Sequence, residues 1–355
     1  MNHPTVATPK PKRLSQAAIA KTLGVSRATV SLILRGGQGA SEATRAKVIA
    51  AAAKMGYRPN ALVHSIRSGK SRTVGVLAQP HDSYWRNVCY GIHDRLIDSE
   101  HLPIFLWNND RRRSGREDYA LKQIHRMLDR WVDGVILWPF FLEVYSQHLH
   151  EFQTRNIPIV AIDHSVPSGI GDVVESDEVQ IAELIVDHLS ALGHRHVLIA
   201  TGPRGQGWAD ERFLALEKAW GKLTGTATHE LRVPLGPNVA DETAALIKGV
   251  LVAHPEITAV NACTDNIAKC AYAAARELGK RIPTHLSVTG VADLDFAALM
   301  GPPLTTVRQD GYAIGQRAAQ IELERSAGLL SGPPRRFRLP GELMVRQSTS
   351  RALKS

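Results

Sequence analysis

The sequence has little cysteine, few aromatic residues and no long apolar stretch, and each scarcity narrows what the protein can be. Its 355 residues include three cysteines, Cys89, Cys263 and Cys270. They have neither metal-ligand nor CxxC spacing, so we expect reduced, buried thiols. No apolar run reaches the 18 residues of a membrane-spanning helix. The N-terminus MNHPTVATPKPKR lacks the apolar segment of a secretory signal. These absences predict a cytoplasmic protein without a membrane partner.

Acidic residues are almost missing from the first 72 positions. This segment holds thirteen Lys and Arg against one acid, Glu42, a net charge of +12. The whole chain carries +9, so residues 73–355 carry −3. A solvated basic face is the ordinary interpretation of such a run, but confinement of the excess charge to one end favours contacts with nucleic-acid phosphates.

Catalytic motifs are also missing. The chain has no G-x-S-x-G and no HExxH, and GPRGQG at 202–207 fits neither phosphate-loop spacing, so we expect a plain strand–helix loop there. The pairs His148/His150 and His194/His196 are two residues apart and do not share a helix face. The sequence therefore predicts no enzyme, no metal site and no cofactor.

Residues 15–36, SQAAIAKTLGVSRATVSLILRG, have the pattern of two short helices joined by a tight turn. Ser15 and Ser26 are expected to cap the two helices, and Gly24 to end the first in the left-handed conformation. Such a pair is a helix-turn-helix, whose second helix enters the DNA major groove. Ordinary core helices are the alternative. A third helix is expected from Ser41 to Gly56, and a short segment from Asn60 to Gly69 is too small to hold a helix alone.

From Thr73 onward, apolar runs of strand length alternate with longer helical stretches. This alternation predicts parallel sheets covered by helices on both faces. The expected strands are 74–78, 104–107, 134–138, 159–162, 197–200, 259–262 and 286–290. The helices expected between them include 119–129, 181–192, 211–222, 243–253 and 268–278.

Seven motifs together resemble the lactose-repressor (LacI/GalR) family of bacterial transcription regulators, over about residues 14–349. They are GVSRATVS (24–31), SEATRAKVIAAAAKMGYRPNAL (41–62), VDGVILWP (132–139), IPIVAID (157–163), LGHRHVLIA (192–200), PPLTTVRQD (302–310) and LPGELMVRQST (339–349). No single motif would suffice, but seven in the family's order identify the chain as a member.

The resemblance implies an all-α helix-turn-helix domain followed by an α/β domain of two Rossmann-like subdomains, the type I periplasmic-binding-protein fold. The expected boundaries are a disordered basic arm at 1–13, the DNA-binding domain at 14–58, a hinge helix and linker at 59–72, and an effector-binding and dimerisation domain at 73–355. Within the last, we expect one subdomain at about 73–165 and 308–337 and the other at about 166–307 and 338–348.

The DNA-reading surface departs from the family pattern at two positions. Leu32 stands where the family usually has a guanine-reading arginine, and Ile66 replaces the leucine that enters the minor groove. Leucine can touch a thymine methyl but cannot hydrogen-bond guanine. The expected DNA contacts are Ser26, Arg27, Ala28, Thr29, Ser31, Leu32, Arg35, Asn60, Val63, Ile66 and Arg67.

By position in the family, the effector is expected between the two subdomains. Arg212 matches the family's effector arginine, and its fork suits a carboxylate, a phosphate or paired hydroxyls. Ala292 replaces an Asp that binds sugar hydroxyls in sugar-responsive members, which disfavours a simple sugar. At least one of the two rings after Asp82 is expected to pack in the core. The predicted effector contacts are Asp82, Tyr84, Trp85, Trp138, Asp177, Gln180, Arg212, Asp265 and Asp293.

These features predict a ligand-responsive transcriptional regulator, more often a repressor, that binds pseudo-palindromic operator DNA as a homodimer. In a bacterium it would be cytoplasmic and associated with the nucleoid when bound. One alternative is the solute-binding protein of a transporter, against which the missing signal and the +12 segment argue. The other is a constitutive DNA binder with a decayed pocket.

Overall fold

The computed structural model of the chain describes residues 15–34, 37–57, 69–78, 80–107, 116–138, 142–163, 169–205, 207–234 and 239–353. The chain divides into two compact units, Met1–Ser71 and Arg72–Ser355. The first, as far as residue 57, is called the head, and the second is called the large unit. No single described helix is long and apolar enough to cross a membrane, although α1 and α2 pass on length and composition when taken as one pair bent by 113°.

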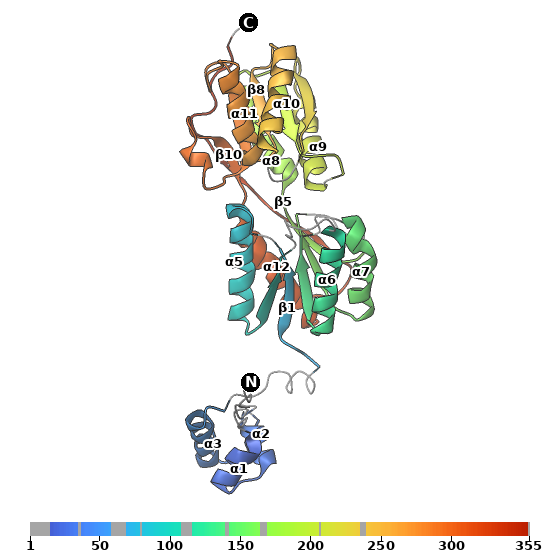
Figure 1. Cartoon of the computed structure of the whole chain (residues 1–355), viewed down its shortest axis with the longest axis vertical. Helices are drawn as coiled ribbons and strands as arrows, with labels where there is room; N and C mark the ends of the chain where they lie inside the picture. Colours follow the sequence, from blue (N-terminus) through green and yellow to red (C-terminus); the bar gives the residue numbers. More distant parts are fainter. Residues whose placement is uncertain are drawn as a thin grey trace, which may run out of the picture. The chain divides into compact units, whose positions relative to one another are not determined.

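The head is a cluster of three helices, α1 (Gln16–Leu23), α2 (Arg27–Leu34) and α3 (Glu42–Lys54) (Figure 1). Ser15 accepts a hydrogen bond from the Ala18 amide, and Gly24 ends α1 at φ 67°, as predicted from the sequence. Ser26 accepts from the Thr29 amide at 3.0 Å. One face of each helix is buried, and the shared core consists of Ile19, Ala20, Val30, Ile33, Val48 and Ala52.

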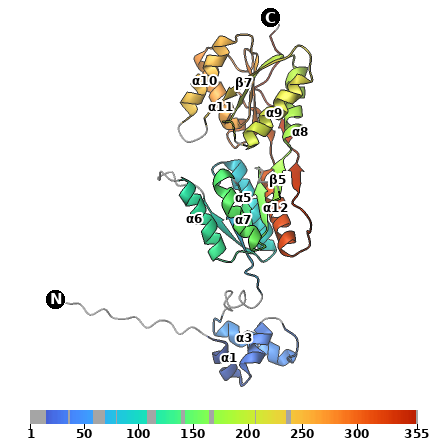
Figure 2. The same ribbon diagram turned by 90° about the vertical axis from the view of Figure 1, so that its right-hand side faces the viewer.

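The large unit contains two lobes, each a six-stranded sheet with helices on both faces (Figures 1 and 2). The first lobe has the strand order β11-β5-β4-β3-β1-β2. Its strands are β1 (Thr73–Leu77), β2 (Leu102–Leu106), β3 (Gly134–Leu137), β4 (Ile159–Ile162), β5 (Asp172–Ser176) and β11 (Arg336–Leu339), all parallel to their neighbours. Its helices are α5 (Ser83–Asp98), α6 (Arg116–Asp129), α7 (Leu142–Thr154) and α12 (Gly311–Ser326).

The second lobe has the order β12-β10-β9-β8-β6-β7, antiparallel only at β12 within this sheet. Its strands are β6 (His196–Thr201), β7 (Ala227–Arg232), β8 (Ala259–Ala262), β9 (Ser287–Ala292), β10 (Thr305–Arg308) and β12 (Glu342–Met344). The helices around it are α8 (Glu178–Ala191), α9 (Gly207–Gly221), α10 (Ala240–Ala253), α11 (Asp265–Glu277) and the short 3-10 turn η1 (Ala297–Leu299).

Close helix packing in the first lobe depends on glycine. A Cβ on Gly91 of α5 would lie 2.1 Å from the Tyr312 carbonyl oxygen, and one on Gly315 of α12 would lie 2.1 Å from that of Val88. Because no side chain separates the two backbones, α5 and α12 lie side by side along their length (Figure 1). This pair covers one face of the first sheet, and α6 and α7 lie on the other (Figure 2).

The chain passes between the lobes three times, and two of these passages lie later in the sequence than expected. Residues 172–176 were assigned to the second subdomain, but they form β5, which pairs with β4 in the first sheet. Likewise, residues 338 and 339 belong to β11 of the first sheet. Both strands carry charged residues, such as Glu175 and Arg338, which interrupt the apolar pattern that the prediction relied on and pair with each other in the fold.

His194 is buried and structural, with Nδ1 2.8 Å from Thr258 Oγ1 and Nε2 3.0 Å from the Ser350 carbonyl oxygen. Two smaller predictions are confirmed. The three cysteines are free and buried. Residues 202–205 lie between β6 and α9, as expected of a strand–helix loop.

Candidate DNA interface and ligand cleft

The N-terminal end of α2 presents an exposed surface. Ser26, Arg27 and Ala28 are exposed, and Thr29 is half-buried. In the part of the chain that the structure describes, the Arg27 guanidinium has no hydrogen-bond or ion-pair partner, whereas Arg45 donates to the Gly37 carbonyl oxygen at 2.6 Å. An arginine left unpaired by the fold is available to a phosphate or a base edge.

Three further predicted DNA contacts on α2 are engaged in hydrogen bonding or packing within the head. The Thr29 hydroxyl lies 2.8 Å from that of Ser26, so both belong to the helix cap. Ser31 is buried at 8% exposure and offers little surface to a phosphate. Leu32 is half-buried against the following loop, because a Cβ on Gly37 would come within 2.5 Å of its Cδ1. Leu32 therefore packs against this loop, a contact that a sequence comparison alone does not reveal.

The remaining predicted DNA contacts, Arg35, Asn60, Val63, Ile66 and Arg67, lie outside the described residues, as do the basic arm and the expected hinge helix.

In the large unit, the ends of several strands bring polar side chains together between the lobes. Arg212, in the first half of α9, is 4% exposed. Its Nε and Nη2 each donate to a carboxylate oxygen of Glu178 at 2.6 Å, and its Nη1 donates to the Cys263 carbonyl oxygen at 2.6 Å. Glu178 is the first residue of α8, and Cys263 follows β8. The predicted effector arginine is thus held by a bidentate, nearly buried ion pair.

Next to this ion pair lies a buried tyrosine–carboxyl pair. The Tyr84 hydroxyl, in the first turn of α5, donates to Asp163 Oδ2. Burial raises the pKa of Tyr84 well above its ordinary value, and Asp163 raises it further. Burial also raises the pKa of Asp163 to about 7, against the opposing effects of Tyr84 and Arg212. Near neutral pH, this carboxyl can therefore either donate or accept a hydrogen bond.

Ser176 and Gln309 extend the polar cluster across the lobe boundary. Ser176 ends β5 of the first lobe, and Gln309 follows β10 of the second. Gln309 Nε2 donates to Ser176 Oγ at 2.7 Å, and both side chains are buried. Open α/β sheets bind ligands beyond the carboxyl ends of their strands. Asp163, Ser176 and Gln309 all lie at such ends.

Aromatic rings form an adjacent wall in the first lobe. The rings of Trp85 and Trp138 lie 4.5 Å apart between centroids, and the His81 ring is stacked on Trp138 at 5.5 Å. Trp85 is buried, whereas Trp138, after β3, is half-buried. Both Tyr84 and Trp85 belong to the first lobe's apolar core, which confirms that at least one of these rings packs there.

A loop of the second lobe closes over this wall. Leu294 is 4% exposed and packs among the core residues that include Tyr84 and Trp85. The Asp295 amide donates to Ser83 Oγ at 3.1 Å, and Arg86 donates to Asp295 Oδ2 at 2.8 Å. The loop from Ala292 to Phe296 therefore joins the two lobes across the start of α5.

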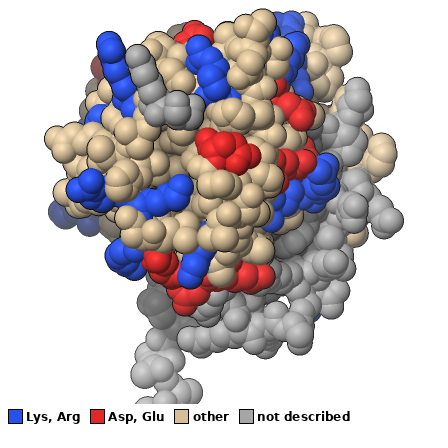
Figure 3. Space-filling view, turned by 90° about the horizontal axis from the view of Figure 1, so that it is seen from above, with Lys and Arg blue, Asp and Glu red and all other residues tan. Residues whose placement is uncertain are grey.

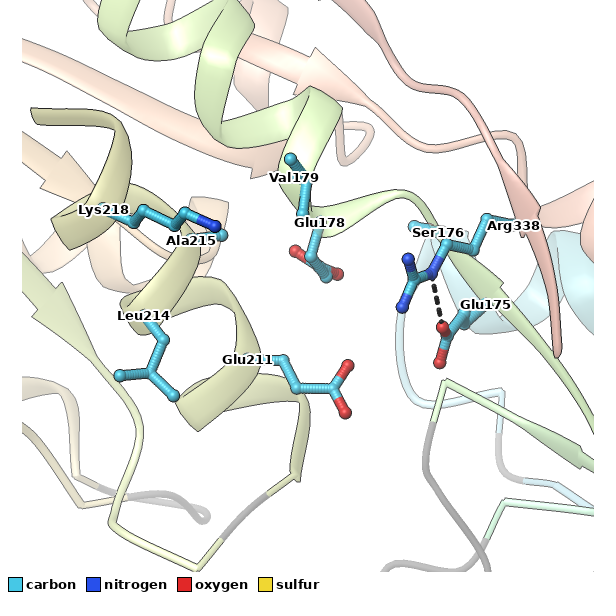
Figure 4. Close-up of a pocket in the computed structure, with 9 residues that line it drawn as sticks. All are labelled: Glu175, Ser176, Glu178, Val179, Glu211, Leu214, Ala215, Lys218 and Arg338. Carbon is cyan, nitrogen blue, oxygen red and sulfur yellow. Dashed lines mark hydrogen bonds and ion pairs between the residues drawn. The ribbon is translucent and has the colours of Figure 1, made fainter. Parts of the chain in front are cut away.

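An open pocket lies beside the Arg212–Glu178 pair, where β5 and β11 meet α8 and α9. Three carboxylates face it, those of Glu175, Glu178 and Glu211, with Arg338 bound to Glu175 at 3.0 Å (Figure 4). Lys218 lines the α9 side. The pocket gives solvent a route to the carboxylate that holds Arg212.

The structure does not bring the other predicted contacts to the cleft in a form that favours ligand binding. Asp265 is fully buried, and its two oxygens accept from the Leu294 amide and from Thr306 Oγ1, both at 2.7 Å. Asp293 forms ion pairs with Arg308 at 2.9 Å and Arg346 at 2.6 Å. Both carboxylates hold the second lobe together, which argues against them as effector contacts.

Hydrogen bonds within the fold, two of them helix caps, account for three more of these predictions. Asp82 accepts from the Trp85 amide at 2.9 Å, and Asp177 accepts from the Gln180 amide at 3.1 Å. The Gln180 side chain exchanges two hydrogen bonds with the Gly341 backbone, at 3.1 and 2.9 Å. Gln180 is therefore a brace between α8 and the segment before β12. Asp82 and Asp177 begin their helices.

Sequence reasoning missed Asp163, Glu178 and Ser176. Asp163 directly follows the buried strand β4 and is the last residue of the motif IPIVAID, so its position at a strand end was an available signal. Glu178 follows a capping Asp and looked like an ordinary first-turn acid. Its role depends on Arg212, which is 34 residues away in the sequence.

Comparisons with known proteins agree with this geometry. Residues 17–60 match the family described as bacterial regulatory proteins, lacI family, and residues 186–349 match the periplasmic binding protein-like domain. The ribose operon repressor of Halalkalibacterium halodurans is 27% identical over 337 residues, covering 93% of this chain and 96% of that one. The transcriptional repressor PurR of Aliivibrio fischeri is 26% identical and covers 95% and 98%.

Solved structures share the fold. The Lac repressor dimer bound to operator and the anti-inducer ONPF superposes with a TM-score of 0.80 at 24% identity, covering 96% of this chain and 100% of that chain. The regulator CelR in complex with cellobiose gives 0.68 at 23% identity, covering 95% and 100%. The curated relatives are transcriptional regulators rather than enzymes. With its helix-turn-helix head and two-lobed α/β unit, the chain belongs to the LacI family of bacterial regulatory proteins.

Proposed function

We propose that this protein is a homodimeric, cytoplasmic transcriptional repressor whose operator affinity is set by a small molecule bound between its two lobes. It would act without an enzymatic activity and bind the nucleoid only while on its operator. The exposed, unpaired Arg27 at the start of α2 carries the DNA-reading half of this proposal. The polar cluster of Arg212, Glu178, Asp163 and Tyr84 carries the ligand half.

Reading DNA requires two heads in fixed geometry. The N-terminal residues of a recognition helix contact base edges, and a two-fold dimer matches two half-sites. In the head, Ser26, Arg27 and Ala28 take this position, and Leu32 replaces the usual arginine. We infer an operator that is an inverted repeat, without the guanine that an arginine at position 32 would read.

The cleft favours a neutral or weakly basic ligand over an anion. Glu178 already neutralises Arg212, and three carboxylates face the neighbouring pocket. Asp163, titrating near neutrality, suits a hydroxyl or an amine. The half-buried Trp138, beside Trp85, supplies an apolar surface for a ring. A hydroxyl-bearing ring compound, such as a glycoside or nucleoside, combines these features, whereas Ala292 disfavours a free monosaccharide.

Ligand control would act through the lobes. A compound that bridges Asp163 of the first lobe and Arg212 of the second would change the equilibrium between open and closed arrangements of the two lobes. The first strand of the first lobe, β1, follows the head in the sequence, so this lobe is the one joined to the head by the chain. Shifting such a balance from 1:99 to 99:1 needs roughly 5.5 kcal/mol of differential affinity. Two ligands in a dimer would share that amount.

Two experiments test the halves separately. In binding-site selection, the full-length protein should enrich an inverted repeat, and Arg27→Ala should lose most of the enrichment while Lys54→Ala, on the exposed end of α3, keeps it. In a thermal-shift screen, ribose, cellobiose, nucleosides, sugar acids and aromatic acids are compared. A shift with a nucleoside or glycoside supports the ligand half, whereas a shift with acids alone contradicts the proposed ligand class. A screen without any shift favours a constitutive binder.

A further inference from the structure

Two histidines and a glutamate meet at the end of the second lobe that faces away from the cleft. His229 lies in the edge strand β7, His254 follows the last residue of α10, and Glu256 lies in the turn before β8. The cleft lies at the carboxyl ends of these parallel strands, so the turn before β8 is at the opposite end of the sheet. The cluster is therefore separate from the site described above.

The spacing of the three ligand atoms suits a tetrahedral metal ion. Glu256 Oε1 lies 3.2 Å from His254 Nδ1 and 3.8 Å from His229 Nε2. One ligand atom from each residue can be chosen so that all three lie within 4.8 Å of one another. With Zn–N and Zn–O bonds near 2.1 Å, tetrahedral geometry separates ligand atoms by about 3.4 Å. Only small side-chain rotations would be required.

An unsatisfied nitrogen supplies a second, independent observation. His229 Nε2 is buried but has no hydrogen-bond partner among the described residues. Leaving a buried polar atom unpaired typically costs about 1–3 kcal/mol, so such atoms call for a ligand, an ion or a function. This nitrogen lies on the side of the ring that faces Glu256.

We propose that His229, His254 and Glu256 bind a late first-row divalent cation of the Zn²⁺ class. Two imidazoles and one carboxylate are a common zinc ligand set, which leaves a fourth position for water. The metal would tie the edge strand β7 to the α10–β8 turn and so stabilise the second lobe without touching the ligand cleft.

A similar group in the first lobe offers an internal comparison. His125, His148 and Glu151 bring ligand atoms equally close, with Glu151 Oε1 3.2 Å from His148 Nδ1 and 3.8 Å from His125 Nε2. In contrast to His229, neither histidine has a buried unpartnered nitrogen among the described residues. Two matched triads in one chain allow each to be removed while the other is retained.

The test uses the full-length protein, stripped with EDTA and then dialysed against ZnCl₂ at about 10 μM, with bound zinc measured by elemental analysis. We expect His229→Ala to bind one equivalent less than wild type, and Glu256→Gln, at an exposed residue, to weaken this equivalent about tenfold or more. Zinc should raise the unfolding temperature of wild type and of His93→Ala, which removes an exposed His–Asp pair lacking a third ligand. That rise should shrink in His229→Ala.

Two results would overturn the proposal. One is wild-type protein that binds no zinc under these conditions. The other is zinc that is fully retained by His229→Ala and Glu256→Gln but lost in His148→Ala, which would place the metal on the first lobe. If His229→Ala does not fold, Glu256→Gln alone decides between these outcomes.

Discussion

Arg27 of the head is a predicted DNA contact and Arg212 of the large unit a predicted effector contact, but the two arginines have opposite environments in the fold. Arg27 is exposed and has no partner among the described residues, whereas Arg212 is 4% exposed with three of its nitrogens engaged. The head, with a net charge of +12 in its segment, leaves its cations to meet phosphates. The large unit is close to neutral, and acidic and basic side chains are interspersed on the face seen in Figure 3.

This difference shows that the two sites respond differently to mutation. Removing an exposed, unpaired side chain from the head should change DNA binding without changing the stability of the fold. Removing a cleft side chain also leaves its partner buried without compensation, so binding and stability change together.

The largest effect is expected on deleting residues 1–71, which should abolish operator binding. The large unit has its own apolar clusters and should remain folded and able to bind its ligand. Electrophoretic mobility shift with the selected operator and circular dichroism of the truncated chain measure the two properties. If the truncated chain kept its operator affinity, the assignment of DNA binding to the first unit would be contradicted.

Arg212→Ala should abolish the ligand response and lower the free energy of unfolding by about 3–5 kcal/mol, because it strands the nearly buried Glu178 carboxylate. The double variant with Glu178→Ala should recover part of the stability but none of the ligand binding. Urea denaturation and calorimetry with the screening hit provide the measurements. Arg27→Ala, as the control, should unfold like wild type. Equal stability of Arg212→Ala and wild type would refute the ion pair's role.

Asp163→Asn should change how stability depends on pH. Burial raises the folded-state pKa of Asp163 to about 7, above its unfolded value near 3.9, so its contribution is fully present below about pH 4 and is lost as the pH rises through 7. As the pH rises from about 4 to 7, the free energy of unfolding of wild type should therefore decrease relative to that of the variant, by up to about 1.4 kcal/mol per pH unit. Urea denaturation at pH 5 and pH 8 tests this. A constant difference between the two proteins would show that Asp163 does not titrate there.

The smallest effect is expected at Ala292, whose φ of 118° is a conformation that side chains rarely adopt. Ala292→Gly should relieve this strain and stabilise the protein by about 1 kcal/mol. Ala273→Gly, within helix α11, should instead destabilise it by about the same amount. Thermal unfolding distinguishes the two signs, and a destabilised Ala292→Gly variant would mean that the loop is not strained.

The sequence predicts the fold and the head more completely than the cleft. Local signals such as Ser15, Gly24 and Ser41 define the head's helices, and apolar runs predict seven of the twelve strands among the described residues. The other five, β5, β7, β10, β11 and β12, were missed because charged residues interrupt their apolar pattern, and those residues find their partners only after folding. For the same reason, Asp265 and Asp293 looked like ligand contacts, whereas their partners Thr306, Arg308 and Arg346 lie far along the chain.

The most direct test of ligand control is the operator dissociation constant of the full-length protein, measured by fluorescence anisotropy with and without a saturating screening hit. The proposal predicts a change of about tenfold or more in wild type and in Lys54→Ala, and none in Asp163→Asn combined with Arg212→Ala. The proposal would be contradicted if the bound compound left the operator affinity of wild type unchanged, because ligand binding in the cleft would then have no effect on DNA binding by the head.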